Sequence, residues 1–358
     1  MAIIAVAGRT SRIRRALVDA ITSRGKHEVK ILSRKLRCRL VPDANDSLAK
    51  ETGVPVIAVD YSDVEELTRV FEKNKIDTVI SALFTMPVAG VAPEVCLIPA
   101  VQGSKTTRRF IPSNWGIPLD ASHQEMTPSV PMKLRAAAEL QKSDLEHTVF
   151  YPGFLLDYYT GTSIKSYMPP LIVVIDMEHN VAAILGSGTT PIAFTHSLDI
   201  GRYVDAALDV EKWDSSYRIV RDKSTWNDFV KSAQTANGIP FTIVHDSVED
   251  LKKGRVTILP AVEKYLHLMS VPNKEVLSQF LGTFGQLFAD GSFNIKEEGA
   301  LNERFPEIKP LTIKAAVEAA AKADIEFIVQ KPVLFNECYS TGFPALNLNP
   351  QRSNRVFQ

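Results

Sequence analysis

The sequence lacks most of the features that mark a protein as secreted, membrane-spanning or metal-dependent. Its three cysteines lie far apart and form no Cys-x-x-Cys or Cys/His spacing, which argues against a disulfide framework and a zinc site. The first apolar run stops at Arg9, too early for the core of a signal peptide. The run LIVVI at Leu171–Ile175 is far shorter than a membrane-spanning helix.

Two further absences narrow the possible partners. Lysine plus arginine and aspartate plus glutamate each number 41, so no net charge favours nucleic acid or an anionic membrane. The GxSxG, HExxH, EF-hand and Walker patterns do not occur, and the seven histidines show no metal-ligand spacing. We therefore expect a soluble, cytoplasmic protein, monomeric or homodimeric, that binds a small-molecule substrate and no metal.

What is present is a regular alternation of strand and helix patterns. With 358 residues, 45% of them hydrophobic, the chain can bury a large core. Over residues 1–160, apolar runs of strand length alternate with helical stretches, which predicts a parallel sheet covered by helices. The predicted strands are Ile3–Ala7, Glu28–Leu32, Val56–Val59, Thr78–Ser81, Arg109–Pro112 and Thr148–Tyr151, and the predicted helices are Ile13–Arg24, Val64–Asn74, Val91–Val101 and Met132–Lys142.

Beyond residue 155 the alternation becomes irregular and the helical stretches dominate. We therefore predict an α/β fold, a Rossmann-like doubly wound parallel sheet with a smaller mixed, mainly helical substrate lobe. The Rossmann-like domain is expected at residues 1–155. The lobe, interleaved with the sheet edge, is expected at residues 156–330, and a C-terminal extension at residues 331–358.

Ligands of such sheets bind at the carboxyl ends of the strands, which directs attention to the segment AVAGRTSRIRR. A strand runs into Gly8, and a helical pattern follows from Ile13. Glycines in a dinucleotide-binding loop provide a tight turn, room for the pyrophosphate and close helix packing. Here Ser11 and Arg14 occupy the places of the second and third glycines.

Five segments together resemble one protein family. They read AVAGRTSRIRRALVDAI, VKILSRK, IDTVISAL, RRFIPSNWG and TVFYPGFLLDYY. Their order and approximate spacing resemble those of NmrA-like and isoflavone-reductase-like proteins, a group of atypical short-chain dehydrogenases. The likeness is close over residues 1–160 and loose over residues 160–330, and its style is that of the fungal members. The resemblance implies NADP(H) as cofactor and a place in secondary metabolism.

By this resemblance the pyrophosphate is bound by Gly8, Thr10, Ser11, Arg12 and Ile13. Backbone amides at a helix N-terminus attract a phosphate without any particular side chain, and a nearby arginine adds charge-assisted hydrogen bonds. Arg14 must point its side chain outward or push the helix away from the strand, and the question left open is whether it turns outward or fills the space where the pyrophosphate would lie. The alternative interpretation is a solvated basic helix end on a protein that has lost its cofactor.

The resemblance also assigns the adenosine end of the cofactor. In this family an arginine just after the second strand meets the 2′-phosphate of NADP, and Arg34 with Lys35 stands in that place. After the third strand, Asp60 and Tyr61 resemble the pair that borders the adenine. A helix N-cap is the local alternative for this second segment.

Small and polar residues follow the fourth and fifth strands. By the resemblance the ribose, pyrophosphate and nicotinamide pass Ser81, Ala82, Leu83, Ser113 and Asn114. The family's acidic residue is Asn114 here, so a charge is missing, and its phenylalanine is Trp115, which we expect to face the substrate. A Ser-Ala pair is also common at any buried strand end.

The segment FYPGFLLDYY supplies the remaining walls of the predicted cleft. The resemblance implies that the residues beside the nicotinamide are Tyr151, Pro152, Gly153 and Phe154. Substrate contacts are expected from Leu155, Tyr158 and Tyr159. For the two tyrosines, an aromatic core stripe is an equally good interpretation.

Lys133 is the candidate for proton transfer. It begins a helical pattern at the position of the family's active-site lysine, and partial burial beside a cofactor would lower its pKa. A reduction needs a proton donor for the product oxygen, and Lys133 would supply that proton or hold the ribose. Ser129 occupies the place of the tyrosine in the common YxxxK pairing. The alternative is a lysine on the surface of a helix.

Three functions remain open from the sequence. The first is an NADP(H)-dependent oxidoreductase acting on a small or medium-sized apolar organic substrate. The second uses the same fold and cofactor for an isomerisation or cyclisation without net redox change. The third is a redox-sensing regulator that binds a dinucleotide and a protein partner without catalysis.

Overall fold

A computed structural model describes residues 1–8, 12–35, 44–83, 93–127, 129–269 and 271–322. Its largest sheet has six strands in the order β3-β2-β1-β4-β5-β6, and all neighbours are parallel. The strand order reverses between β1 and β4, as in a doubly wound fold. The strands are β1 (Ile3–Ala7), β2 (Glu28–Arg34), β3 (Val56–Val59), β4 (Thr78–Ser81), β5 (Arg109–Ile111) and β6 (Glu146–His147).

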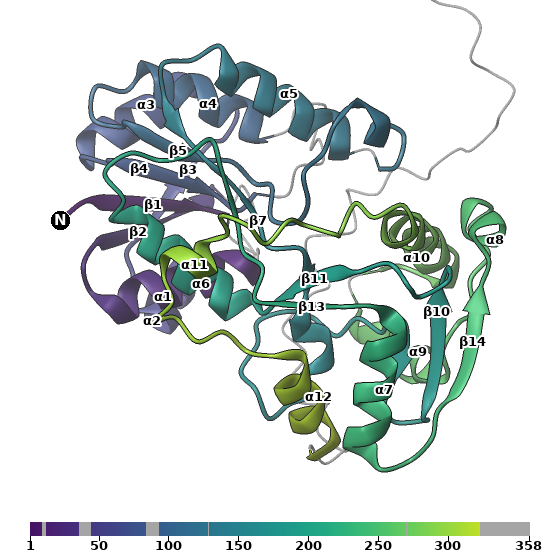
Figure 1. Ribbon diagram of the computed structural model, residues 1–358. Coiled ribbons are helices and arrows are strands. Elements are labelled where there is room, and N and C mark those ends of the chain that lie inside the picture. The colour runs from purple at the N-terminus through teal and green to yellow at the C-terminus, as the bar shows by residue number, and fades with distance from the viewer. Residues whose placement is uncertain (9–11, 36–43, 84–92, 128, 270, 323–358) are drawn as a thin grey trace, which may run out of the picture.

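Helices cover both faces of this sheet, with α3, α4 and α5 on one face and α1, α2 and α6 on the other (Figure 1). Successive side chains of β1 point to opposite faces of the sheet and so contribute to the cores on both faces. Ile4 and Val6 pack with α1 and α6, whereas Ala5 and Ala7 pack with α3 and α4. The helices are α1 (Arg12–Arg24), α2 (Ala44–Thr52), α3 (Val64–Lys73), α4 (Pro93–Gly103), α5 (Ser129–Gln141) and α6 (Ser197–Leu208).

The predicted sixth strand, Thr148–Tyr151, is divided between two partners. β6 pairs with β5, whereas β7 (Val149–Tyr151) pairs in parallel with β12 (Ser216–Arg218). Pro112 follows β5 and has no backbone N–H, so pairing with β5 cannot continue along the chain. The chain therefore leaves the large sheet after β6, and β7 leads into the lobe.

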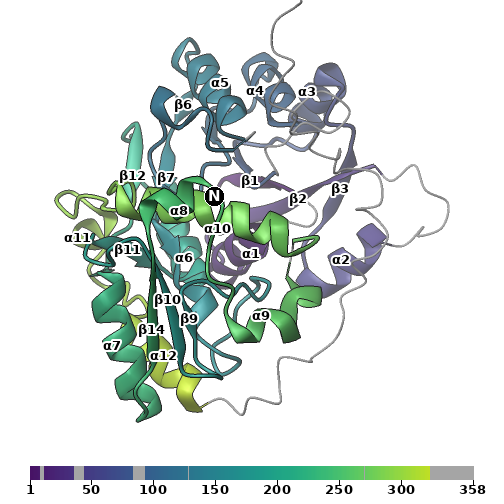
Figure 2. The same cartoon turned by 90° about the vertical axis from the view of Figure 1, so that its right-hand side faces the viewer.

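The lobe is mixed and mainly helical, as predicted; it lies to the right of and below the sheet in Figure 1, and Figure 2 views the molecule from that side. Besides the β7 and β12 pair it has two three-stranded sheets. The strands are β8 (Phe154–Leu155), β11 (Ile192–Thr195) and β13 (Asp222–Ser224) in one sheet, and β9 (Ile175–Asp176), β10 (Val181–Leu185) and β14 (Thr242–Asp246) in the other. The helices are α7 (Trp226–Asn237), α8 (Val248–Lys252), α9 (Pro260–Tyr265), α10 (Lys274–Ala289), α11 (Leu301–Arg304) and α12 (Ile313–Lys322), with short 3-10 helices at Ala121–His123, Leu156–Tyr159 and Leu266–Leu268.

One helix from beyond residue 155, α6, is part of the helix layer that covers the large sheet. α6 packs on α1, and a Cβ added at Gly201 would lie 2.5 Å from the carbonyl oxygen of Ala16. The predicted domain division, with its lobe interleaved with the sheet edge at residues 156–330, stays a prediction. The predicted C-terminal extension lies outside the described residues, and within them no helix is long and apolar enough to cross a bilayer.

We expect Gly201→Ala to lower the free energy of unfolding by about 2 kcal/mol or more, because the added methyl group meets backbone that cannot move aside. Alanine has the higher helix propensity by about 1 kcal/mol, so the steric effect must exceed this gain. Urea unfolding measures the difference. Gly103→Ala in α4 is the control, since its Cβ would meet Thr68 at an ordinary 3.5 Å; equal unfolding midpoints for the two variants would contradict the close packing.

Candidate functional site

The carboxyl end of β1 is joined by hydrogen bonds to both neighbouring strands. The Gly8 amide donates to the carbonyl of Leu32 at 3.1 Å, and the Ala82 amide donates to the carbonyl of Ala7 at 2.9 Å. Gly8 has a φ of 129°, which a residue with a Cβ rarely adopts. The chain therefore turns directly after β1, at the switch point where doubly wound sheets bind ligands.

The first residues of α1 follow this turn. Ile13 is buried, and Nη1 of Arg12 donates to the carbonyl of Tyr167 at 3.1 Å, which ties the start of α1 to the lobe. The predicted pyrophosphate contacts Thr10 and Ser11 lie outside the described residues. The contacts of Gly8, Arg12 and Ile13 with a pyrophosphate stay predictions.

Arg14 points inward, so the expectation of an outward side chain is wrong. It is 1% exposed, because it lies on the stripe of α1 that carries Val18 and Ile21 and faces the core. Burial lowers the pKa of Arg14 to about 10, and the charge of Arg15 acts in the same direction. The side chain therefore stays protonated at neutral pH, within electrostatic reach of Tyr61 after β3.

The two residues predicted to bind the 2′-phosphate, Arg34 and Lys35, have different surroundings at the end of β2. Arg34 is exposed at the end of β2, whereas the Lys35 Nζ lies 2.6 Å from Oε1 of Glu66 on α3. The Tyr61 hydroxyl donates to the carbonyl of Leu32 at 2.9 Å and ties β3 to β2. Arg34 is therefore the better placed of the two basic residues to meet a phosphate.

The segment after β3 contains a helix N-cap, which was the alternative to adenine binding in the interpretation of the sequence. Asp63 is the N-cap of α3 and accepts a hydrogen bond from the Glu66 amide at 2.8 Å. Asp60 accepts from the amide and hydroxyl of Ser62 at 2.9 and 2.6 Å. The adenine contacts of Asp60 and Tyr61 stay predictions.

Ser113 and Trp115 tie the end of β5 to the end of β4. The Ser113 hydroxyl donates to the carbonyl of Leu83 at 2.7 Å, and Nε1 of Trp115 donates to the carbonyl of Ser81 at 3.1 Å. The indole ring stacks on Phe150 with 5.9 Å between centroids. Trp115 thus fixes the two strand ends, and its contact with a substrate stays a prediction. The buried residues of the β4 end are Ser81, Ala82 and Leu83.

Asn114 carries an unsatisfied polar atom beside these strand ends. Its Oδ1 is buried and accepts no hydrogen bond from the described residues. Leaving a buried acceptor unpaired costs about 1–3 kcal/mol. A bound molecule that supplies an N–H or O–H donor at this point would recover that free energy, so the residue fits the amide or hydroxyl groups of a nicotinamide riboside.

Gly153 gives the chain its turn after β7. Its amide donates to the carbonyl of Gly116 at 3.0 Å, its φ is 79°, and an added Cβ would lie 2.3 Å from the carbonyl oxygen of Ala193. No other residue type fits this place without movement of the backbone. Beside it, Pro152 is buried and Tyr151 is half-buried, and burial raises the pKa of Tyr151.

The aromatic residues that follow divide between the lobe core and the predicted substrate wall. Phe154 is buried, with its ring centroid 5.2 Å from that of Phe288, and the Tyr159 hydroxyl donates to a backbone carbonyl inside the core. The core-stripe interpretation was offered for Tyr158 and Tyr159, and both tyrosines pack with this core, whereas the predicted contact of Phe154 with the nicotinamide stays a prediction. Leu155 and Tyr158 are half-buried, and burial raises the pKa of Tyr158.

Lys133 lies in the second turn of α5 and is half-buried. Burial lowers its pKa, and the carboxylate of Glu94 opposes this shift. Glu94 lies in the first turn of α4, is 3% exposed, and accepts a hydrogen bond from the Ser113 amide at 2.5 Å. Sequence reasoning missed Glu94, whose signal was a lone acidic residue in the apolar stretch PEVCLIPAV.

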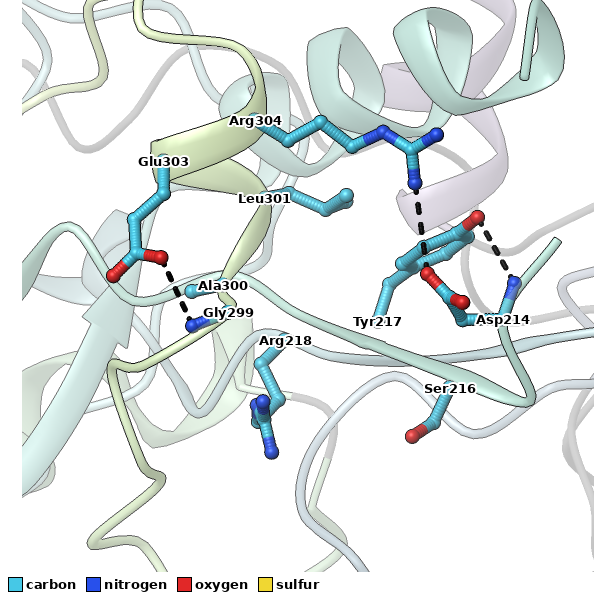
Figure 3. Close-up of a pocket in the computed structure, with 9 residues that line it drawn as sticks. All are labelled: Asp214, Ser216, Tyr217, Arg218, Gly299, Ala300, Leu301, Glu303 and Arg304. Atoms are coloured by element: carbon cyan, nitrogen blue, oxygen red, sulfur yellow. Dashed lines mark hydrogen bonds and ion pairs between the residues drawn. The ribbon is translucent and has the colours of Figure 1, made fainter.

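A polar hollow of about 510 Å³ lies elsewhere, between β12 and α11 (Figure 3). Arg304 pairs with Asp214 at 3.5 Å, the Asp214 amide donates to the Tyr217 hydroxyl, and Glu303 accepts from the Gly299 amide. None of the residues predicted to bind cofactor or substrate lines it, and its polar groups bond to one another. Within the described ranges, no group of three or more His, Cys, Asp or Glu residues could hold a metal ion.

Comparison with known proteins decides the family. The model of the NmrA-like family matches residues 2–277, which is most of the chain. The chain belongs to the NmrA-like family. The match spans the large sheet and most of the lobe, so the resemblance drawn from the five segments is confirmed, and with it the predicted fold class.

Relatives of this NmrA-like protein include fungal and plant enzymes. It is 31% identical to "Oxidoreductase BOA1" of Botryotinia fuckeliana (strain B05.10) over 86% of its own chain and 95% of the relative. It is 23% identical to "Bifunctional pinoresinol-lariciresinol reductase 2" of Thuja plicata over 88% of its chain and 97% of that protein.

Solved structures share the fold at lower identity. "AtPrR2 with NADP+ and (+)pinoresinol" aligns with a TM-score of 0.68 and 17% identity, over 89% of this chain and 98% of that one. The binary complex of leucoanthocyanidin reductase with NADPH from Vitis vinifera aligns with a TM-score of 0.67 and 17% identity, over 89% and 99%. The NmrA-like chain therefore has the architecture of these reductases.

Proposed function

We propose that this NmrA-like protein is an NADP(H)-dependent oxidoreductase acting on a small or medium-sized, largely apolar substrate. The observation that carries the proposal is the continuous row of linked strand ends, with exposed Arg34 at the end of β2 and half-buried Lys133 on α5. A relative named an oxidoreductase that aligns over 95% of its length supports it, and so do the NADP-containing structures of the same fold. Likeness to fungal members favours a role in secondary metabolism.

The adenosine end of the row suits NADP rather than NAD. Arg34 offers a planar guanidinium for the 2′-phosphate, while the buried charge of Arg14 adds positive potential beside the β2 and β3 ends. At the other end, the unsatisfied Oδ1 of Asn114 suits a donor on the nicotinamide riboside. The small residues after β4 leave the backbone open to close approach.

When bound, NADPH would supply the hydride. Lys133 would hold a proton on Nζ next to the reacting carbon–oxygen bond and donate it to the product oxygen. Half-buried Trp115, Tyr151 and Tyr158 would keep water from the reacting atoms and accept an apolar substrate. This division of roles needs no tyrosine four residues before Lys133, where Ser129 stands.

We expect Arg34→Ala to weaken NADPH binding by about tenfold or more, because a charge-assisted hydrogen bond is lost, and to leave NADH binding unchanged. Fluorescence titration of the purified protein with each cofactor measures both dissociation constants. Arg69→Ala is the control, since Arg69 is an exposed arginine on α3 away from the strand ends. Equal losses for NADPH and NADH would contradict the role of Arg34, and wild-type protein that binds no NADPH at about 100 μM would overturn the proposed function.

Replacing Lys133 should separate chemistry from binding. We expect Lys133→Ala to slow hydride transfer by about a hundredfold or more while the dissociation constant for NADPH changes little. Because burial lowers the pKa of Lys133, the wild-type rate should fall as pH rises through a value below that of an ordinary lysine, since only the protonated amine donates. Lys133→Ala should lack this decline.

The measurement is stopped-flow oxidation of bound NADPH against pH, with an apolar carbonyl or enone substrate found by screening. Lys142→Ala, which changes an exposed lysine at the end of α5, should behave as wild type. A wild-type profile retained in Lys133→Ala would contradict the assignment. Conversion of substrate without net NADPH consumption would favour the redox-neutral alternative.

A further inference from the structure

Strand β14 forms an uncovered edge of the lobe. It is the outer strand of the sheet β14-β10-β9, and no described strand pairs with its other side. Figure 1 shows it at the outer border of the molecule, beyond β10. Residues 242–245 of β14 are all exposed, whereas the neighbouring strand β10 is buried over Ala182–Leu185. The strand therefore presents open backbone donors and acceptors to solvent.

Apolar side chains gather at the same edge. Among the described residues, the large hydrophobic side chains that are exposed belong to Met1, Ile239, Ile243 and Val244. Apart from Met1, they all lie within one segment of six residues. Edge strands commonly carry a lysine, a proline or a bulge that discourages pairing, but the sequence TIVHD has neither residue, and its register with β10 is continuous. Such a cluster is typical of a contact surface.

The pairing of β14 with β10 determines which backbone groups stay open. The Thr242 amide donates to the carbonyl of Asn180 at 2.9 Å, which fixes the phase of the parallel ladder. Along a strand, successive residues direct their N–H and C=O groups to opposite sides, so the even-numbered residues of β14 bond to β10. The odd-numbered residues, Ile243 and His245, therefore direct their backbone groups outward.

A second copy of β14 supplies the matching groups. When two identical strands pair antiparallel about a two-fold axis through Val244, Ile243 of each copy lies opposite His245 of the other. Opposed residues of this kind exchange both N–H···O=C hydrogen bonds. Because the axis repeats the exchange on its other side, every outward backbone group of Ile243 and His245 finds a partner.

The charges of the strand do not oppose this pairing. Val244 would meet its own copy on the axis, and two valines pack well across strands. The acidic residue of β14, Asp246, is buried and accepts from the amide and hydroxyl of Thr257 at 2.8 and 2.7 Å. Nδ1 of His245 donates to the carbonyl of Gly186 at 3.1 Å, within its own chain. The edge is thus self-complementary and nearly neutral.

We propose that β14 is a homodimer interface, in which it pairs antiparallel with β14 of a second copy about an axis at Val244. The three-stranded sheets of the two lobes join into one continuous sheet, and Ile243 and Val244 lose their exposure to water. A pair of short strands is small beside the about 1,200 Å² that stable complexes bury, so the dimer forms at micromolar rather than nanomolar concentrations. This interface is independent of the proposed activity.

The first test measures assembly of the full-length protein in the absence of cofactor. Sedimentation velocity between about 1 and 300 μM should show monomer giving way to dimer. Val244→Lys places like charges opposite each other on the axis and should raise the dimer dissociation constant by about tenfold or more. Gln141→Lys is the control, because it adds the same charge at an exposed position on α5, and it should leave the dissociation constant unchanged.

Two results of this test would overturn the proposal. One is wild-type protein that stays monomeric up to about 300 μM. The other is a dimer that Val244→Lys weakens no more than Gln141→Lys does, because its interface would then lie elsewhere. Lysine is tolerated on exposed edge strands, so Val244→Lys should fold, and circular dichroism checks this.

The second test locates the interface by disulfide formation. On the axis, the Cα atoms of position 244 in the two copies approach about 4.5 Å, within the reach of a disulfide. Mild oxidation of Val244→Cys should therefore join two chains through position 244, which mass spectrometry of the linked peptide identifies. Thr242→Cys is the matched control on the same strand, because position 242 lies about 13 Å or more from its copy and should link at least about tenfold less.

The disulfide experiment can also contradict the proposal. Equal linking in Val244→Cys and Thr242→Cys would indicate random collision. A bond from position 244 to Cys338 of the same chain would assign the edge to the C-terminal segment 323–358 instead of a second copy. Neither test contains NADPH, so both are separate from the titration that judges the proposed function.

Discussion

The parallel pairing of β1 with β2 on one side and β4 on the other is the constraint on which the site depends. Ala7 is in register with Leu32 and with Ser81, so β1 and β4 end at one level, whereas β2 continues for two more residues to Arg34. Beyond that level the backbone must find other partners, and it does so across the gap between strands, from Gly8 to β2 and from Ala82 to β1. The residues that could meet a cofactor are the ones that these hydrogen bonds hold in place.

Buried charge is distributed unevenly along this edge. Arg14 contributes a buried guanidinium near Tyr61, which follows β3, and Glu94 is buried at the β5 end, where it accepts a hydrogen bond from the Ser113 amide. Each of these groups loses hydration on burial and is tolerated only with compensation from its neighbours or a ligand.

Much of this arrangement follows from the local sequence pattern. The parts that do not follow from it are determined by contacts between residues that are far apart in the sequence. The strands β1, β3 and β4 have the predicted bounds, because each is a short apolar run between turn residues. The sequence did not predict α2, because the polar segment from Ala44 to Thr52 has little hydrophobic periodicity. The inward turn of Arg14 was readable from the helical stripe it shares with Val18, but the glycine motif suggested otherwise. Glu94 could not be assigned, since its partner Ser113 is brought to it only by the packing of α4 on the sheet.

The packing of α6 on α1 also affects how the chain is made. α1 ends at Arg24 and its covering helix begins at Ser197, so the buried side of α1 has no complete cover while the intervening chain is being synthesised. At usual rates of translation this interval is roughly 10 to 35 s. During this interval the α1 side of the nascent sheet keeps apolar surface exposed, so the first half of the chain is open to non-native contacts until α6 has been made.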